Sequence, residues 1–202
     1  MLTQEQRLRM LEQPAGQVDL VLDTDAYNEI DDQFAISYAL HAPEKINLLA
    51  LYAAPFYNER STGPADGMER SYQEILNLLH LSRMERPVYR GSRGYLPDEK
   101  TPVDSPAAAD LCRRAMGYSP EKPLYVAAIG AITNVSSALL MQPEIADRIV
   151  VIWLGGNALH WHDNQEFNIR QDVAAARVVF SSGAPLVMLP CKGVVSSFCT
   201  TG

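Results

Sequence analysis

The stretch VDLVLDTDAYNEIDD at residues 18–32 is the part of the sequence that decides the fold. It opens with the aliphatic and β-branched run Val18–Leu22, which is typical of a β-strand. A helical pattern then begins at Ile30, after a short and mostly polar segment. A strand followed closely by a helix is the repeating unit of α/β proteins with a parallel sheet.

The same pattern recurs along the whole chain. Five more runs of this kind are Ile46–Ala53, Val88–Tyr89, Leu124–Ile129, Ile149–Leu154 and Leu186–Leu189. Most of these runs lack polar alternation, which indicates strands that are buried on both faces. The alternating order predicts an open, mostly parallel, Rossmann-like α/β sheet flanked by helices, with right-handed crossovers.

Helical patterns fill most segments between the expected strands. Two sets of residues form apolar stripes at helical spacing: Ile30, Phe34, Tyr38 and Leu40, and then Tyr72, Ile75, Leu76 and Leu79. Further helices are expected at Ala107–Met116, Val135–Met141 and Val173–Phe180. Residues 89–106 are rich in Gly, Pro and Asp, so we expect a long surface loop there.

Length and composition limit the class of protein. The chain has 202 residues, of which 47% are hydrophobic and 20% are charged. These values predict a single domain over residues 1–202 and exclude a disordered chain, a collagen-like repeat and a coiled coil. The 17 basic and 24 acidic residues give a formal net charge of -7, which disfavours a nucleic-acid partner.

The sequence shows no signal of export, membrane insertion or disulfide formation. Residues 1–13 hold no apolar stretch of signal-peptide length, and no later window approaches the ~20 apolar residues of a membrane span. We therefore expect a cytoplasmic protein that does not enter a membrane. Cys112, Cys191 and Cys199 have neither CxxC nor Cys/His spacing, so we expect neither a disulfide framework nor a zinc site.

Four carboxylates stand close together where the first expected strand ends. Asp23 and Asp25 follow the strand, while Asp31 and Asp32 lie where the next helix begins. In a parallel α/β fold, ligands bind at the carboxyl ends of the strands. Helix capping would account for the second pair but not for the first. The cluster therefore predicts a site for a hard divalent cation, Ca²⁺ or Mg²⁺.

Several motifs in a fixed order carry a family resemblance. They are the acidic stretch at 23–32, AAIGAITN at 127–134, IVVIWLGG at 149–156, EFNI at 166–169, and Asp172 with Ala174 and Ala175 after it. In this order they resemble the inosine-uridine preferring nucleoside hydrolases, from about Val18 to Pro190. The turn AYNEI at 26–30 departs from the family, which has a Pro-Gly turn two residues shorter.

The resemblance implies a reaction and a cofactor. The reaction is hydrolysis of the N-glycosidic bond of ribonucleosides, purine or pyrimidine or both, with the help of a bound Ca²⁺. Asp25, Asp32 and the backbone carbonyl of Thr133 are implied as ligands of the ion. Asp25 is implied as the general base, because a carboxylate beside a cation-bound water can take its proton at neutral pH. Asn168 is expected to be the second catalytic residue.

The resemblance also implies residues that bind a small-molecule nucleoside. Asp31 is expected to hydrogen-bond a ribose hydroxyl, while Glu166 and Asn168 hold the sugar from the opposite side. His160 or His162 is expected to contact the nucleobase or to assist its departure. The alternative is that both histidines are exposed loop residues.

Members of the family are longer than this chain. Their C-terminal segment brings a further Asp ligand of Ca²⁺ and, in many members, a His near the leaving base. No residue after Pro190 matches that His-Asp motif, so we expect residues 1–202 to be a partial version of the domain. Family members are commonly dimers or tetramers, and we expect a homo-oligomer here.

Other functions stay open on the sequence alone. The Asp23-Thr24-Asp25 strand end also resembles the nucleophile motif of haloacid dehalogenase-type phosphatases, although Tyr27 stands where that motif has Thr or Val. A non-catalytic nucleoside- or sugar-binding relative is a further alternative. Taken singly, Glu166 and Asn168 also suit a loop acid and a turn-forming Asn, and Thr133 suits the start of a helix.

Overall fold

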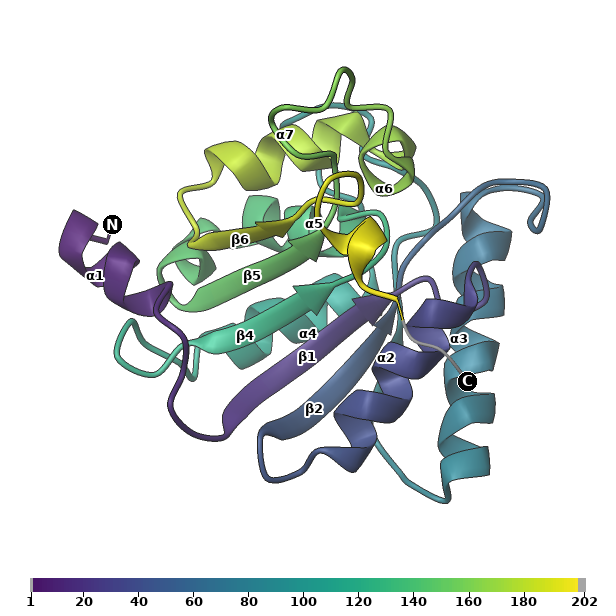
Figure 1. Cartoon of the computed structure of the whole chain (residues 1–202), viewed down its shortest axis with the longest axis horizontal. Coiled ribbons are helices and arrows are strands. Elements are labelled where there is room, and N and C mark those ends of the chain that lie inside the picture. The colour runs from purple at the N-terminus through teal and green to yellow at the C-terminus, as the bar shows by residue number, and fades with distance from the viewer. Residues whose placement is uncertain (1, 200–202) are drawn as a thin grey trace.

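The chain folds around a six-stranded sheet with the strand order β3-β2-β1-β4-β5-β6, in which every neighbouring pair is parallel (Figure 1). The computed structural model describes residues 2–199, so Met1 and residues 200–202 of the expected 1–202 domain lie outside the described part. The strands are β1 (Val18–Thr24), β2 (Ile46–Ala53), β3 (Val88–Arg90), β4 (Leu124–Ala128), β5 (Ile149–Leu154) and β6 (Leu186–Leu189). The predicted open, parallel α/β sheet is therefore confirmed strand by strand.

All five helical segments expected from the sequence are helices. The helices are α1 (Gln4–Met10), α2 (Ile30–His41), α3 (Pro64–Ser82), α4 (Pro106–Ala115), α5 (Thr133–Met141), α6 (Phe167–Gln171) and α7 (Val173–Ser181), with short 3₁₀ helices η1 (Pro143–Asp147) and η2 (Val195–Ser197). Of these, α1 and α6 fall outside the predicted segments. Among the helices of residues 2–199, none has the length and apolar character needed to cross a membrane.

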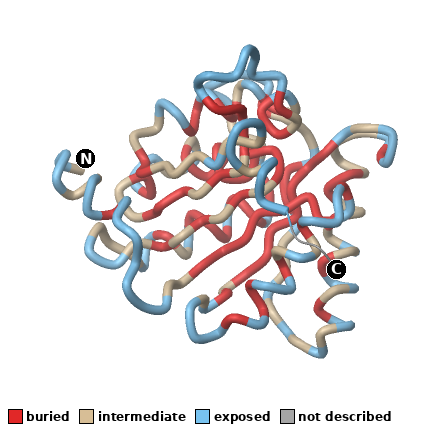
Figure 2. The backbone as a smooth tube through the Cα atoms, in the orientation of Figure 1, coloured by how far each residue is buried: buried red, intermediate tan, exposed pale blue. Residues whose placement is uncertain are grey.

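Helices cover both faces of the sheet. Neighbouring residues of a strand point to opposite faces. Leu22 of β1 accordingly packs in one core with Ile36 of α2 and Ile75 of α3. Val21 packs in the other core with residues of α4, α5 and α7 such as Leu111. The four central strands β1, β2, β4 and β5 are therefore buried along most of their length, whereas the edge strands β3 and β6 are only partly covered, as Figure 2 shows.

The order of strands reverses beside β1, and this positions the site. From β1 the chain moves outward to β2 and β3, then crosses back to β4 and continues outward to β5 and β6. Loops that leave the two strands at such a switch point part in opposite directions, which opens a crevice at the carboxyl edge of the sheet. The turn after β1 begins at Asp25, and Ile129 and Gly130 follow β4 at the same edge.

The direction in which α2 faces corrects one expectation. The stripe of Ile30, Phe34 and Tyr38 is exposed, with 67%, 66% and 69% of these residues accessible to solvent. The buried face instead carries Ile36 and, one turn earlier, Asp32, which accepts a hydrogen bond from a β1 side chain. Because residues four apart share a helix face, the inward position of residue 32 turns residues 30, 34 and 38 outward.

Candidate active site

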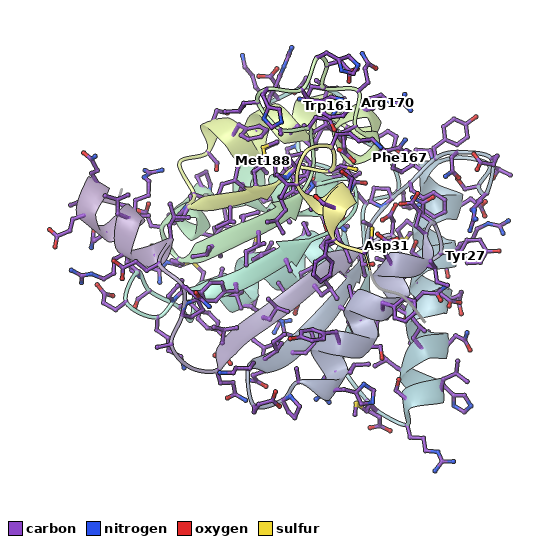
Figure 3. The ribbon with its side chains drawn as sticks, viewed as in Figure 1. Tyr27, Asp31, Trp161, Phe167, Arg170 and Met188 are labelled. Carbon is purple, nitrogen blue, oxygen red and sulfur yellow. The ribbon has the colours of Figure 1, made fainter. Side chains whose placement is uncertain are left out.

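The cleft at the switch point has a volume of about 570 Å³ and is formed by five segments of the chain. These are the turn after β1, the residue after β4, the end of β5 with the loop that follows, the start of α6, and the segment around η2. Asp31, Trp161 and Phe167, which line the cleft from different segments, are labelled in Figure 3. A second hollow of about 640 Å³ shares Glu29 and Asp31 with the cleft and continues over the start of α2.

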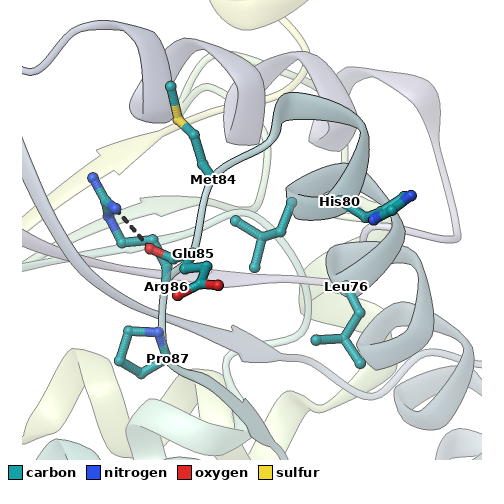
Figure 4. A pocket seen from close by; sticks show the side chains of 7 residues that line it. Leu76, His80, Met84, Glu85, Arg86 and Pro87 are labelled. Carbon is teal, nitrogen blue, oxygen red and sulfur yellow. Dashed lines mark hydrogen bonds between the residues drawn. The ribbon is translucent and has the colours of Figure 1, made fainter.

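A cavity of about 540 Å³ at the other edge of the sheet offers no comparable chemistry. It lies between the C-terminal turn of α3 and Pro87, which precedes β3 (Figure 4). The Arg86 side chain there donates a hydrogen bond to the backbone carbonyl of its own neighbour, Glu85. This cavity lies at the amino ends of the strands, whereas ligands of such sheets bind at the carboxyl ends.

Asp25 lies at the bottom of the cleft and is held in place by its own turn. Its residue is 1% exposed, and Asn28 Nδ2 donates a hydrogen bond to Asp25 Oδ2 at 3.0 Å. Asn28 is fixed in turn by Asn58, whose Nδ2 donates to Asn28 Oδ1 at 2.7 Å. Gly130 allows the carboxylate to sit there, because a Cβ at that position would lie 2.7 Å from Asp25 Oδ1.

Asp32 is the second buried carboxylate of the site. It is 4% exposed, and Thr24 Oγ1 donates a hydrogen bond to Asp32 Oδ1 at 2.5 Å. Burial raises the pKa of Asp32 to about 7, against the lowering effect of the Thr24 hydrogen bond. Burial also raises the pKa of Asp25 well above its ordinary value, and the negative charge of Asp32 raises it further. The two carboxylates therefore repel each other in a place with little water.

Asp23 has a different role from the one its spacing suggests. It is fully buried and does not line the cleft. Asn134 of α5 donates a hydrogen bond to Asp23 Oδ1 at 2.7 Å, while Oδ2 has no hydrogen-bond partner among the described residues. Burial raises the pKa of Asp23 to about 7. Asp23 therefore lies within β1 and away from the cleft, so the expected cluster of four carboxylates at the site does not include it.

The oxygen atoms of Asp25, Asp32 and Thr133 are suitable ligands for a divalent cation. Within residues 2–199, no basic side chain forms an ion pair with Asp25 or Asp32, so the two buried carboxylates receive hydrogen bonds but no opposite charge from the described chain. Groups of three or more His, Cys, Asp or Glu side chains close enough to hold a metal are absent from the same residues. Thr133 begins α5 and is fully buried, and its hydroxyl donates to Asp172 Oδ2 at 2.7 Å. Two carboxylates with backbone oxygen and water are an oxygen-only set of the kind that Ca²⁺ accepts.

Glu166 lies on the opposite wall, where its carboxylate caps α6. Its Oε1 accepts from Asn168 N at 2.9 Å, and its Oε2 accepts from Gly156 N at 2.8 Å and Ile169 N at 3.0 Å. Gly156 has a φ of +73°, a conformation that favours glycine. Glu166 thus joins the loop after β5 to the first turn of α6, a role beyond that of a plain loop acid.

Asn168 connects the ends of two strands and faces the cleft. Its Nδ2 donates to Ile129 O at 3.1 Å and to Leu154 O at 2.9 Å, which are the carbonyls at the ends of β4 and β5. Both amide hydrogens are therefore used by the backbone. The side-chain oxygen, Oδ1, is the atom that is left to accept a hydrogen bond from a ligand.

The two loop histidines lie in different places. His162 lines the cleft together with Trp161 and Asp163. His160 is exposed, does not line the cleft, and lies close to Gly193 on the segment after β6. The structure therefore brings Asp25, Asp31, Glu166 and Asn168 to one cleft. Asp32 and Thr133 are buried and do not line it, and neither does the exposed His160.

Several residues of the cleft are missed by sequence reasoning. Asn28, Glu29, Asn157 and Lys192 all line it. Burial raises the pKa of Glu29, and the charges of Asp31 and Glu166 raise it further. Of these four residues, only Asn28 could have been predicted from the sequence, since an Asn three residues after an Asp can donate a hydrogen bond to it across a turn. The other three come together only through the fold.

Comparison with known proteins gives this geometry a family. The family model described as inosine-uridine preferring nucleoside hydrolase matches residues 20–200. The chain belongs to this family. Its resemblance to the nucleoside hydrolases, inferred from the order of motifs, is therefore confirmed.

Individual relatives agree with the family. The non-specific ribonucleoside hydrolase RihC of Escherichia coli (strain SMS-3-5 / SECEC) is 31% identical, and the match covers 84% of this chain and 60% of the relative. The purine-preferring ribonucleoside hydrolase from Gardnerella vaginalis has a TM-score of 0.69 and 28% identity, over 86% of this chain and 60% of that one. A nucleoside hydrolase from Bacillus anthracis, 16% identical with a TM-score of 0.56 over 86% of this chain and 65% of its own, shares the fold. The chain thus spans about 60% of the length of the first two relatives.

Proposed function

We propose that this chain hydrolyses the N-glycosidic bond of ribonucleosides, purine or pyrimidine or both, to ribose and free base. The observation that carries the proposal is the buried pair Asp25 and Asp32, which has no basic partner among the described residues. Asp25 lines the same cleft as Glu166 and Asn168. The family match supports this reaction, and the relatives named above are ribonucleoside hydrolases. A phosphatase of the haloacid dehalogenase type is disfavoured, because the match runs through the EFNI motif.

We propose Ca²⁺ as the cofactor of this site. Asp25, Asp32 and the backbone carbonyl of Thr133 would hold the ion, with water completing the oxygen ligands. When bound, Ca²⁺ would neutralise the two buried carboxylates, orient the ribose hydroxyls and favour loss of a proton from the attacking water. The burial of Asp25 and Asp32 without a basic partner among the described residues supports this assignment.

The side chains of the cleft would divide the remaining work. Asp25 would accept the proton of the attacking water, and Asp31, on the rim, would hydrogen-bond a ribose hydroxyl. Asn168 would accept from the sugar through Oδ1, since its two N–H groups are already used. Glu166 accepts three backbone hydrogen bonds, one of them from Asn168 N, and these bonds keep Asn168 in position. Its carboxylate would also contact the sugar. His160 would reach a substrate only from the rim.

Assembly and location are part of the same proposal. We expect copies of the chain to form a homo-oligomer, a dimer or tetramer, in the cytoplasm. The exposed apolar side chains Ile30, Phe34 and Tyr38 on α2 support association, because large apolar surfaces are commonly buried between subunits. Light scattering on the purified chain would measure the assembly state, and a monomer at micromolar concentration would contradict it.

A direct assay separates the candidate functions. Release of ribose from inosine and uridine would be measured after removal of divalent cations with a chelator and again after addition of Ca²⁺, with 4-nitrophenyl phosphate as a parallel substrate. Ca²⁺-dependent ribose release that is lost in Asp25→Asn supports the proposal. Release of phosphate alone would favour the phosphatase. Binding of inosine in equilibrium dialysis without any turnover would favour a non-catalytic binding protein.

A further inference from the structure

We infer that Asn28 is a positioning residue for Asp25, and that the loop after β2 holds Asn28 in place through Asn58. The inference rests on the proposed function, in which Asp25 binds Ca²⁺ and accepts the proton of the attacking water. Asn28 lies in the turn AYNEI at 26–30, where this chain departs from the shorter Pro-Gly turn of its family. Its role therefore follows from its contacts in this chain and not from the family pattern.

The backbone closes the turn without help from the Asn28 side chain. Asn28 N donates to Asp25 O at 2.7 Å, which is the hydrogen bond between the first and fourth residues of a β-turn. The side chain adds a second hydrogen bond, from Asn28 Nδ2 to Asp25 Oδ2 at 3.0 Å. Asn28 is 4% exposed and lines the cleft. The side-chain bond therefore acts on the Asp25 carboxylate and not on the turn.

A chain of three hydrogen bonds fixes which end of the Asn28 amide faces Asp25. Arg60 N donates to Asn58 Oδ1 at 2.9 Å, so the Asn58 amide presents its Nδ2 on the other side. Asn58 Nδ2 donates to Asn28 Oδ1 at 2.7 Å. The Asn28 oxygen is thereby occupied, which leaves Nδ2 as the end that faces Asp25. An ionised carboxylate only accepts hydrogen bonds, so this is the orientation that Asp25 needs.

The loop that carries Asn58 is anchored to α6. Tyr57 N donates to Gln171 Oε1 at 2.7 Å, and Gln171 Nε2 donates back to Tyr57 O at 3.2 Å. Gln171 is the last residue of α6, the helix that also carries Asn168. The segment that orients Asp25 is therefore tied to the helix on the opposite wall of the cleft.

The Asn28 bond decides which oxygen of Asp25 is left for a cation. With Oδ2 bound to Asn28, Oδ1 lies toward Gly130, where an added Cβ would be 2.7 Å away. Gly130 follows β4, and Thr133 begins α5 three residues later. Oδ1 is thus turned toward the segment that contains the proposed carbonyl ligand. Partners that orient a metal ligand in this way commonly contribute about 10–100-fold to metal affinity or activity.

Calorimetric titration with Ca²⁺, and turnover of inosine at saturating Ca²⁺, test the inference. Asn28→Ala is expected to weaken Ca²⁺ binding by about 10-fold and to lower kcat by at least as much. KM for inosine should change little, because the proposed sugar contact of Asn168 lies on the other wall. Asn77→Ala is the matched control, since Asn77 is exposed on α3, and it should change none of the three values.

The variant Asn58→Asp separates positioning from folding. It keeps the oxygen that accepts from Arg60 N, and so keeps the local turn, but it removes the donor to Asn28. Only Nδ2 of Asn28 can bond to the new carboxylate, so the Asn28 amide should turn its oxygen toward Asp25. We expect Ca²⁺ binding to be as weak as in Asn28→Ala, with little change in the midpoint of thermal unfolding in chelator. This variant carries the test even where Asn28→Ala loses stability.

Combining Asn28→Ala with Asn58→Ala shows whether Asn58 acts through Asn28. Residues in one hydrogen-bond chain are not additive, so the double variant should bind Ca²⁺ no more weakly than Asn28→Ala alone. Losses that add would overturn the role given to Asn58.

Failure of the inference is distinct from failure of the proposed function. Unchanged Ca²⁺ affinity and kcat in Asn28→Ala, while the unaltered chain binds Ca²⁺ and releases ribose, would overturn the inference alone. A rise in KM with no loss of kcat would also overturn it, because that result would show a role in sugar binding. Absence of both Ca²⁺ binding and turnover in the unaltered chain would overturn the proposed function and this inference with it.

Discussion

Replacement of Asp32 by Asn is expected to stabilise the chain in the absence of divalent cations. Asp32 is 4% exposed, and the hydrogen bond that it receives from Thr24 can equally be accepted by the side-chain oxygen of Asn. The substitution therefore keeps the shape and the contact but removes a buried charge. It also removes the charge that raises the pKa of Asp25.

The magnitude follows from the pKa of Asp32, which rises from 3.8 to about 7 in the folded chain. Because the folded state binds the proton more tightly than the unfolded state, the contribution of this group to stability is full below about pH 4 and is lost as the pH rises through about 7. Each unit corresponds to about 1.4 kcal/mol, so ionised Asp32 costs ~4 kcal/mol at pH 8. Between pH 5 and pH 8, the advantage of Asp32→Asn should grow by roughly 3 kcal/mol.

Urea denaturation at pH 5 and pH 8, with a chelator present, measures this difference in the free energy of unfolding. Asp31→Asn is the matched control, because Asp31 is the adjacent carboxylate and is exposed. Addition of Ca²⁺ should reverse the order at pH 8, since the ion would bind the unaltered chain and not Asp32→Asn. A stability difference that is the same at both pH values, or a destabilised Asp32→Asn at pH 8, would refute the reasoning.

Three further predictions concern the cleft and the surface. Asn168→Ala should lower kcat/KM for inosine and uridine by similar factors and, by leaving two strand-end carbonyls unpaired, reduce stability in thermal denaturation by about 2 kcal/mol; a loss confined to one nucleoside would contradict a role at the sugar. Gly130→Ala should weaken Ca²⁺ binding in calorimetry at least about 10-fold, because its Cβ would lie 2.7 Å from Asp25 Oδ1; unchanged affinity would exclude this. Arg90 lowers the pKa of Glu69 to about 2, so this pair should lose its stabilising effect as the pH falls from about 4.5 toward 2. Glu69→Gln should abolish that part of the acid transition, and an identical transition in both proteins would show that the pair contributes nothing.

The central strands could be predicted from sequence because β1, β2, β4 and β5 are buried along most of their length. A strand such as β5 (Ile149–Leu154) has no polar residue to obscure its hydrophobic run. Helix α6 could not be found in this way, because its five residues are too few to show a period. It exists because Glu166 caps its first turn, and that contact depends on a loop that the sequence does not place.

The acidic motif shows the same limit at the site. Its spacing correctly predicts that Asp25 and Asp32 lie near the carboxyl end of β1, since both belong to one local segment. It does not reveal that Asp23 faces Asn134, because that contact joins residues 111 positions apart. The exposed stripe on α2 has a similar origin, since the inward position of Asp32 decides which face of the helix packs.

The chemistry of Asn168 explains why a sequence motif can mark both a fold and a site. Its position needs two hydrogen-bond donors to hold the carbonyls of Ile129 and Leu154, and these bonds fix the ends of β4 and β5 relative to each other. The same two bonds leave its one acceptor, Oδ1, for a ligand of the cleft that Asn168 lines. Asp at this position would have no donors, and Ala would have neither donors nor acceptor. In the proposed function, the residue that joins the two strands would therefore also meet a sugar hydroxyl, and a change at Asn168 would disturb both roles together.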